Sequence, residues 1–169
     1  MVQLKHWFAW AGLISGLSLA VPAGAEITPM PKEQIKVMQA STSAYKDYML
    51  NCGGCHRFDG EGIGRSSVPS FKNSVGLFTY LQEGREYMIR VPGSSQSQLG
   101  NAELAEVLNW MVAMYSPDQL KADFKPFTAN EVGASRPYRF DDVVVERRRV
   151  GELLGRQGFH LSPYLYGAN

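Results

Sequence analysis

The sequence has few of the residues that would define a disulfide scaffold or a zinc site. Its 169 residues include two cysteines and three histidines. Both cysteines lie in one short segment, so they cannot form the several bridges that hold a small disulfide-rich domain together. The 17 basic and 16 acidic side chains nearly cancel. A chain so balanced lacks the basic surface that is typical of a nucleic-acid-binding protein.

Long hydrophobic runs are also missing. The longest, residues 7–21, has about 15 residues, whereas a membrane-spanning helix needs about 20. It follows Lys5 and ends in the Pro-Ala-Gly-Ala of residues 22–25, which is the pattern of a secretory signal peptide. We therefore predict a signal over residues 1–25, no stable membrane span after its cleavage, and a periplasmic location. An uncleaved anchor and a cell-surface or secreted location are the alternatives.

The rest of the sequence predicts an all-α protein. Apolar residues at helical spacing and capping residues predict helices near residues 41–51, 71–82, 83–90, 101–115 and 141–157. Asn101 is expected to cap the clearest of these helices.

The chain divides into four parts. After the signal, residues 26–40 are expected to form an extended lead-in, because Pro29 and Pro31 limit regular structure. A helical domain follows at 41–116. A C-terminal extension at 117–169 is expected to hold one helix, with a brief turn near Thr128. The apolar residues of the extension either cover the domain or form a docking surface.

The chemistry of the chain is concentrated in Cys52-Gly-Gly-Cys55-His56. This spacing attaches c-type haem, because two thiols three positions apart reach the vinyl groups on one porphyrin edge and the next imidazole faces the iron. We predict one covalent haem c per chain, bound through Cys52 and Cys55, with His56 as an iron ligand. A thioredoxin-like redox pair would need a strand–helix–strand context, and a zinc site would need four ligands. A disulfide between these cysteines would close a very small loop.

The segments after this motif add a resemblance. Asp59-Gly60-x-Gly62, then Val68-Pro69-Ser70-Phe71, and then the apolar helical pattern at 99–110 follow in order. Over residues 40–116 the chain resembles the class I, monohaem cytochrome c family. The resemblance implies that family's helical fold around one haem. It also implies that the Pro69 carbonyl accepts a hydrogen bond from His56 Nδ1, which leaves Nε2 for iron, and that Tyr48 meets Trp110 where two helices cross.

The ligand on the opposite face of the iron is the main departure from the family. There, a methionine in the loop before the last helix usually takes this position, but residues 91–99 contain no methionine. Met88, just before this loop, is our preferred distal ligand. The alternatives are Met111, Met114, His160 and an iron without a protein ligand on that face.

We predict an electron carrier and not an enzyme. The haem would take single electrons from a periplasmic dehydrogenase and pass them towards a terminal oxidase or another cytochrome. Several basic side chains either lie around the haem edge and steer an acidic partner or form an ordinary solvated surface; these are Arg57, Arg65, Lys72, Arg85 and Arg90. Two other functions are open: small-ligand binding at an open or weakly ligated haem, and a tightly held cytochrome subunit of a dehydrogenase complex.

Overall fold

The computed structural model describes residues 27–64 and 68–164. Within these residues the chain is helical and has no strand, only the isolated bridges Pro29–Lys121 and Ile63–Val68. The all-α prediction is therefore confirmed. The predicted signal peptide lies outside the described residues. In the described part, no helix is both long enough and apolar enough to cross a membrane.

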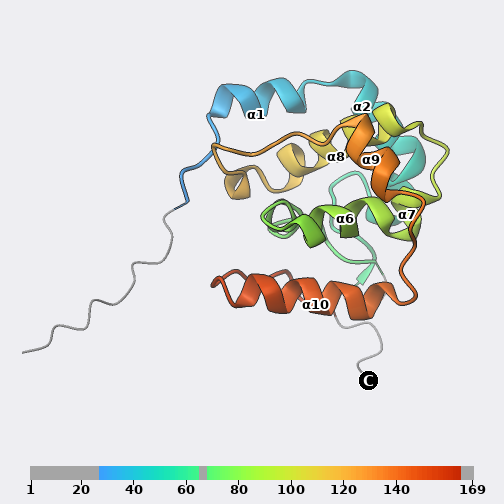
Figure 1. Ribbon diagram of the computed structural model, residues 1–169. Coiled ribbons are helices and arrows are strands. Elements are labelled where there is room, and N and C mark those ends of the chain that lie inside the picture. Colours follow the sequence, from blue (N-terminus) through green and yellow to red (C-terminus); the bar gives the residue numbers. More distant parts are fainter. Residues whose placement is uncertain (1–26, 65–67, 165–169) are drawn as a thin grey trace, which may run out of the picture.

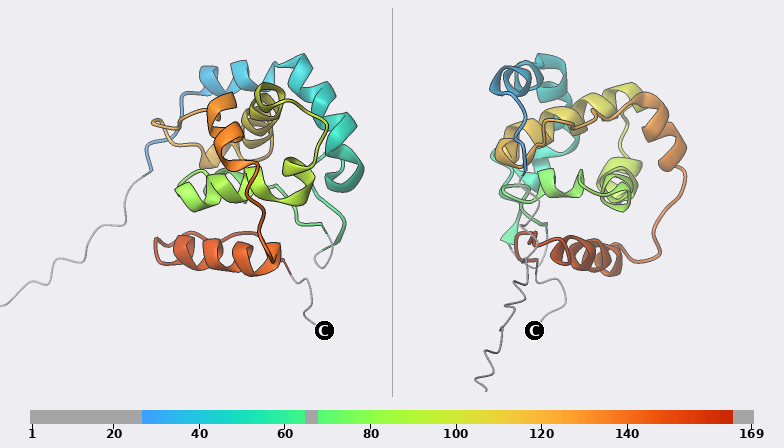
Figure 2. Two further views of the ribbon diagram at one scale, coloured as in Figure 1. Left: turned by 45° about the vertical axis from the view of Figure 1, so that its right-hand side comes forward. Right: turned by 60° about the vertical axis from the view of Figure 1, so that its left-hand side comes forward.

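The helices lie in a simple spatial order. α1 and α2 are on one side of α8, and α6 and then α10 follow on the other side (Figure 1). Figure 2 shows from two further directions that α10 and α1 are at opposite ends of the molecule. The helices are α1 (Lys32–Gln39), α2 (Thr42–Asn51), α3 (Gly53–His56), α5 (Val75–Phe78), α6 (Gln82–Arg90), α7 (Pro92–Ser95), α8 (Asn101–Tyr115), α9 (Ala129–Ser135) and α10 (Val143–Gly155).

α8 is central because most of its surface is apolar. Nine of its 15 residues are buried, and it packs against α1, α2, α5 and α9. A helix that is apolar on nearly all sides belongs in a core. The sequence predicted Asn101 as the N-cap of α8, but the N-cap in the structure is Gly100. The Gly100 N–H donates to Glu103 Oε2 at 2.7 Å, so the glutamate closes the first turn without a capping side chain.

Residues 26–40 are not the extended lead-in that we expected. Eight of them form α1, which packs against α8. Pro31 occupies the N-cap of α1, where its missing N–H removes no helical hydrogen bond. The proline therefore marks the start of a helix. Before it, the Met30 N–H donates to the Leu120 carbonyl at 2.8 Å and ties the N-terminal segment to the extension.

Within its described residues, 117–164, the extension contains two α-helices where the sequence predicted one. The Thr128 hydroxyl accepts from the Glu131 N–H at 3.2 Å, and the expected turn continues into the seven residues of α9. α9 packs against α8, and α10 packs against α6. The extension places several buried side chains in the core: Leu120, Phe127, Val132, Val150 and Leu154. These side chains cover the domain and are not available as a docking surface.

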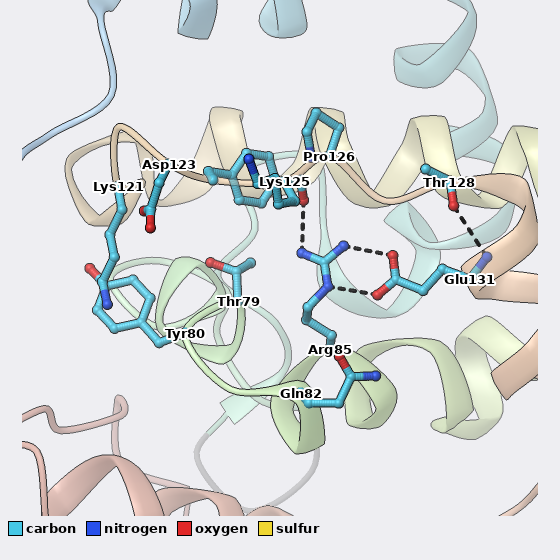
Figure 3. A pocket seen from close by; sticks show the side chains of 11 residues that line it. Thr79, Tyr80, Gln82, Arg85, Lys121, Asp123, Lys125, Pro126, Thr128 and Glu131 are labelled. Carbon is cyan, nitrogen blue, oxygen red and sulfur yellow. Dashed lines mark hydrogen bonds and ion pairs between the residues drawn. The ribbon is translucent and has the colours of Figure 1, made fainter.

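A surface pocket lies where α6 meets the extension (Figure 3). On its floor the Arg85 guanidinium donates to both carboxylate oxygens of Glu131 at 2.6 Å, and to the Lys125 carbonyl at 2.9 Å. Lys121 lies over the Tyr80 ring, 3.8 Å from its centroid. A bidentate arginine–carboxylate pair fixes both partners. The Arg85–Glu131 pair in this pocket therefore holds α6 and α9 together.

Truncation of Leu154 tests whether the extension shares the core of the domain. Leu154 is fully buried on α10, whereas Leu50 on α2 is 83% exposed. Leu154→Ala should lower the free energy of unfolding by about 2–5 kcal/mol, because it removes apolar contacts and leaves a cavity. The control Leu50→Ala should change it by less than about 0.5 kcal/mol. Denaturant unfolding measures both values, and equal effects would contradict a shared core.

Candidate functional site

The cysteine–histidine motif forms one separate helical turn. α2 ends at Asn51, and Cys52 departs from helical geometry (φ −122°, ψ −36°) before α3 begins. The N–H groups of Cys55 and His56 both donate to the Cys52 carbonyl, at 3.2 and 2.9 Å. This turn holds the two cysteines and the histidine together at the end of α2.

The cysteines are free thiols, and their surroundings do not match the competing chemistries. Burial raises the pKa of the Cys52 thiol to about 11, whereas a redox-active cysteine usually has a lowered pKa. Cys55 is exposed. In the described part of the chain, no group of three or more His, Cys, Asp or Glu could hold a metal ion, which argues against zinc.

His56 is oriented through one ring nitrogen. Its Nδ1 lies 3.3 Å from the Pro69 carbonyl oxygen, the contact that the resemblance implies. Because a carbonyl can only accept, Nδ1 carries the proton and Nε2 keeps its lone pair. Burial lowers the pKa of His56 to about 4, although the Pro69 hydrogen bond opposes this shift. The imidazole is therefore neutral at pH 7 and can ligate a metal.

An aromatic ring supports the imidazole from one face. Phe71 stacks on His56 with ring centroids 3.8 Å apart and planes inclined by 16°. The Phe71 carbonyl in turn accepts from Ser116 Oγ at 3.1 Å, which ties Phe71 to the end of α8. The sequence placed Phe71 in the proline segment but gave no indication of this stacking, because the two rings are far apart in the chain.

A glycine allows the Pro69 segment to approach the motif. Gly62 has a φ of +72°, and its N–H donates to the His56 carbonyl at 3.0 Å. A Cβ at this position would lie 2.3 Å from the Val68 oxygen and 2.8 Å from the Pro69 oxygen. The hydrogen bond that orients His56 therefore requires a residue without a side chain at position 62.

Two buried tyrosines hold the backbone just after His56. Tyr48 Oη donates to the Arg57 carbonyl at 2.7 Å, and Tyr115 Oη donates to the Phe58 carbonyl at 2.8 Å. Arg57 has a φ of +62°, which is unfavourable for a residue with a side chain. The Tyr48 ring also lies 5.1 Å from that of Trp110, as the resemblance implies. The role of the tyrosine hydroxyls was not expected.

Arg147 is the functional candidate that the sequence analysis missed. Its side chain is 7% exposed, and Nη2 is buried without a hydrogen-bond partner. The guanidinium contributes to lowering the pKa of His56 and lies 5.2 Å from the Phe78 ring centroid. Among the described residues, no carboxylate forms an ion pair with it. The available signal was its position on the buried stripe of α10 with Val150 and Leu154.

These residues fit a haem group. Two thiols that form no disulfide could provide the attachment points, and a neutral imidazole could provide one iron ligand. A buried cation without an anion is costly, and haem carries carboxylate side chains with which a guanidinium can pair. The unpartnered Nη2 of Arg147 is therefore explained by this group better than by the polypeptide alone.

The distal candidates lie in different surroundings. Met88 is buried on α6, and Met111 is buried on α8. Met114 is 38% exposed, and His160 is exposed on the C-terminal tail. The positions of Met88 and Met111 are therefore both compatible with an interior ligand, whereas Met114 and His160 lie at the surface.

The short loop before α8 is fixed by the extension. Arg136, just after α9, donates to the carbonyls of Ser95, Leu99 and Ser97 at 3.0, 2.6 and 2.6 Å. Residues 91–99, where the family usually places its methionine, are thus held in position by a side chain of the extension.

Comparisons with known proteins indicate the family of the chain. No protein-family model matches the chain. A cytochrome c-552 of Thermus thermophilus is 29% identical over 159 residues, covering 82% of this chain and 93% of the relative. A second protein named cytochrome c-552, also from Thermus thermophilus, is 32% identical over 120 residues, covering 59% of this chain and 91% of the relative. The longer alignment, with 82% of this chain, therefore extends beyond the helical domain predicted at residues 41–116.

Two glycine substitutions test the contact between Pro69 and His56. Gly64 has a φ of +61° like Gly62, but a Cβ there would meet nothing within 4 Å. Gly64→Ala should cost about 1–2 kcal/mol of stability from backbone strain and leave the reduction potential of the haem protein unchanged. Gly62→Ala should also displace the Pro69 carbonyl, make the imidazole less basic and raise the potential. Potentiometric titration measures both variants, and equal potentials would contradict the role of Gly62.

Proposed function

This chain belongs to the cytochrome c family and carries covalently attached haem c, and we propose that it is a periplasmic carrier of single electrons from a dehydrogenase towards a terminal oxidase. The observation that carries the proposal is the neutral, partly buried His56, held through Nδ1 by Pro69 beside Cys52 and Cys55, which are not joined in a disulfide. The haem supplies the one-electron chemistry, and the polypeptide sets its potential and its partners.

Several residues of the motif and its surroundings would bind the haem. Cys52 and Cys55 would form the two thioether bonds, and His56 would ligate the iron through Nε2. Arg147 would pair with a haem carboxylate and neutralise a charge that would otherwise be buried. These contacts bind and orient the group, and cytochromes of this family are typically electron carriers and not enzymes.

The surface beside the motif supports docking through apolar contact. Phe58 and Ile63, on the loop after His56, are 69% and 51% exposed, and Cys55 is exposed next to them in the chain. Large exposed apolar side chains next to a redox group are suited to a transient protein interface. We propose that the donor and the acceptor contact this loop.

The described basic residues that could steer an acidic partner have partners within the chain. Arg57 pairs with Asp59 at 3.6 Å, Lys72 with Glu61 at 2.7 Å, and Arg85 with Glu131 of α9. Arg90 donates to the Tyr138 carbonyl at 2.6 Å, and Arg65 lies outside the described residues. The loop surface is therefore close to neutral, and we propose that charge steering contributes little to partner binding.

We propose Met88 as the distal iron ligand. Met88 and Met111 are both buried, and Met88 is preferred because it lies just before residues 91–99, which contain no methionine. A thioether ligand raises the potential and closes the iron to small molecules, which suits a carrier. The predicted signal at residues 1–25 supports the periplasmic location.

Spectroscopy during a redox titration tests both the carrier and its ligand. The purified protein should show a reversible one-electron transition and, when oxidised, the weak sulfur-to-iron band near the red end of the spectrum. Met88→Leu should lose this band and lower the potential, whereas the control Met111→Leu, also buried, should keep both. A band that survives in Met88→Leu would contradict the ligand. A high-spin protein that binds carbon monoxide rapidly would favour the ligand-binding alternative over the carrier.

A further inference from the structure

Three buried aromatic side chains form a contiguous cluster where α2 crosses α8. Tyr48, Trp110 and Tyr115 contact one another, with ring centroids 5.1 Å (Tyr48–Trp110), 5.5 Å (Tyr48–Tyr115) and 5.7 Å (Trp110–Tyr115) apart. Tyr45, on the outer side of α2, lies 5.8 Å from Trp110. Its side chain is 48% exposed, so the cluster reaches the surface.

The inner end of the cluster reaches the haem-binding motif by two routes. Tyr115 lies 6.0 Å from Phe71, and Phe71 stacks on His56 at 3.8 Å. In addition, the Cys52 N–H donates to the Tyr48 carbonyl at 2.8 Å, and Cys52 is one of the two points of haem attachment. The rings therefore connect the covalent anchor and the iron ligand with the surface at Tyr45.

We propose that Tyr48, Trp110 and Tyr115 conduct oxidising equivalents between the haem and Tyr45. This adds a second electron route, remote from the loop with Phe58 and Ile63, and it rests on the covalent haem but not on any particular donor or acceptor. A surface oxidant such as a peroxide-derived radical takes one electron from Tyr45, which loses its phenolic proton to water and becomes a neutral tyrosyl radical. The reduced haem then supplies one electron through the ring cluster, and water returns the proton. Tyr45 is restored, and the haem is oxidised by one electron.

Hydrogen bonding explains why the route ends at Tyr45. The hydroxyls of Tyr48 and Tyr115 donate to backbone carbonyls, and Trp110 Nε1 donates to the Gln39 carbonyl at 3.2 Å. A carbonyl cannot take the proton that an oxidised tyrosine must lose to form a stable neutral radical. Burial also raises the pKa of both buried tyrosines. Tyr45 is exposed to water, which can accept its proton.

Pulse radiolysis of the reduced, haem-loaded protein tests this route directly. An azide radical takes one electron from an exposed tyrosine and becomes azide, while the phenolic proton goes to water. The reduced haem should then return an electron to Tyr45, seen as haem oxidation coupled to decay of tyrosyl absorbance at a rate independent of protein concentration. This start from the surface does not depend on which ligand occupies the distal face.

Three variants decide the result. Tyr138 is 67% exposed and serves as the matched control, because its ring forms no stacking contact with another ring in the described part of the chain. Tyr45→Phe should lose the concentration-independent phase, Trp110→Phe should slow it, and Tyr138→Phe should keep it. An unchanged phase in Tyr45→Phe or Trp110→Phe would overturn the proposal. Failure of the carrier function would look different, since no variant would then show a reversible haem couple.

Discussion

The hydrogen bond between His56 Nδ1 and the Pro69 carbonyl is the contact on which the site depends. It fixes the imidazole tautomer, and it requires Gly62, because any side chain there would push the carbonyl away. The peptide after His56 is held by the hydroxyls of Tyr48 and Tyr115. A neutral, oriented imidazole is thus obtained from backbone groups and buried hydroxyls.

Three arginines connect the extension with the domain, and one of them, Arg147, acts on His56. Arg85 of the domain pairs with Glu131 of α9, Arg136 pins the short loop before α8, and Arg147 of α10 brings a buried positive charge near His56. Each contact joins residues that are far apart in the sequence. The C-terminal third of the chain therefore works as part of the haem domain, and its apolar side chains complete the same core.

Local sequence patterns were sufficient to predict the haem group and the central helix. The Cys-x-x-Cys-His motif predicted haem c, which the relatives support, and the apolar run before Tyr115 predicted the bounds of α8 as the structure has them. The assignment of Cys52 and Cys55 as attachment residues stays a prediction. α1 was missed because Pro31 was interpreted as a helix breaker and stands at the N-cap. The stacking of Phe71 on His56, the tyrosine hydroxyls and the burial of Arg147 arise from packing between distant segments, which spacing along the chain does not encode. Met88 as distal ligand stays a proposal.

The central claim is that Cys52, Cys55 and His56 together hold one covalent haem, and intact-mass spectrometry under denaturing conditions tests it most directly. The mature protein should retain the mass of one haem after acid denaturation, because thioether bonds survive the loss of the fold. The double variant Cys52→Ser/Cys55→Ser should release its haem under the same conditions. A wild-type chain with the mass of the bare polypeptide, or with its two thiols joined in a disulfide, would contradict the claim.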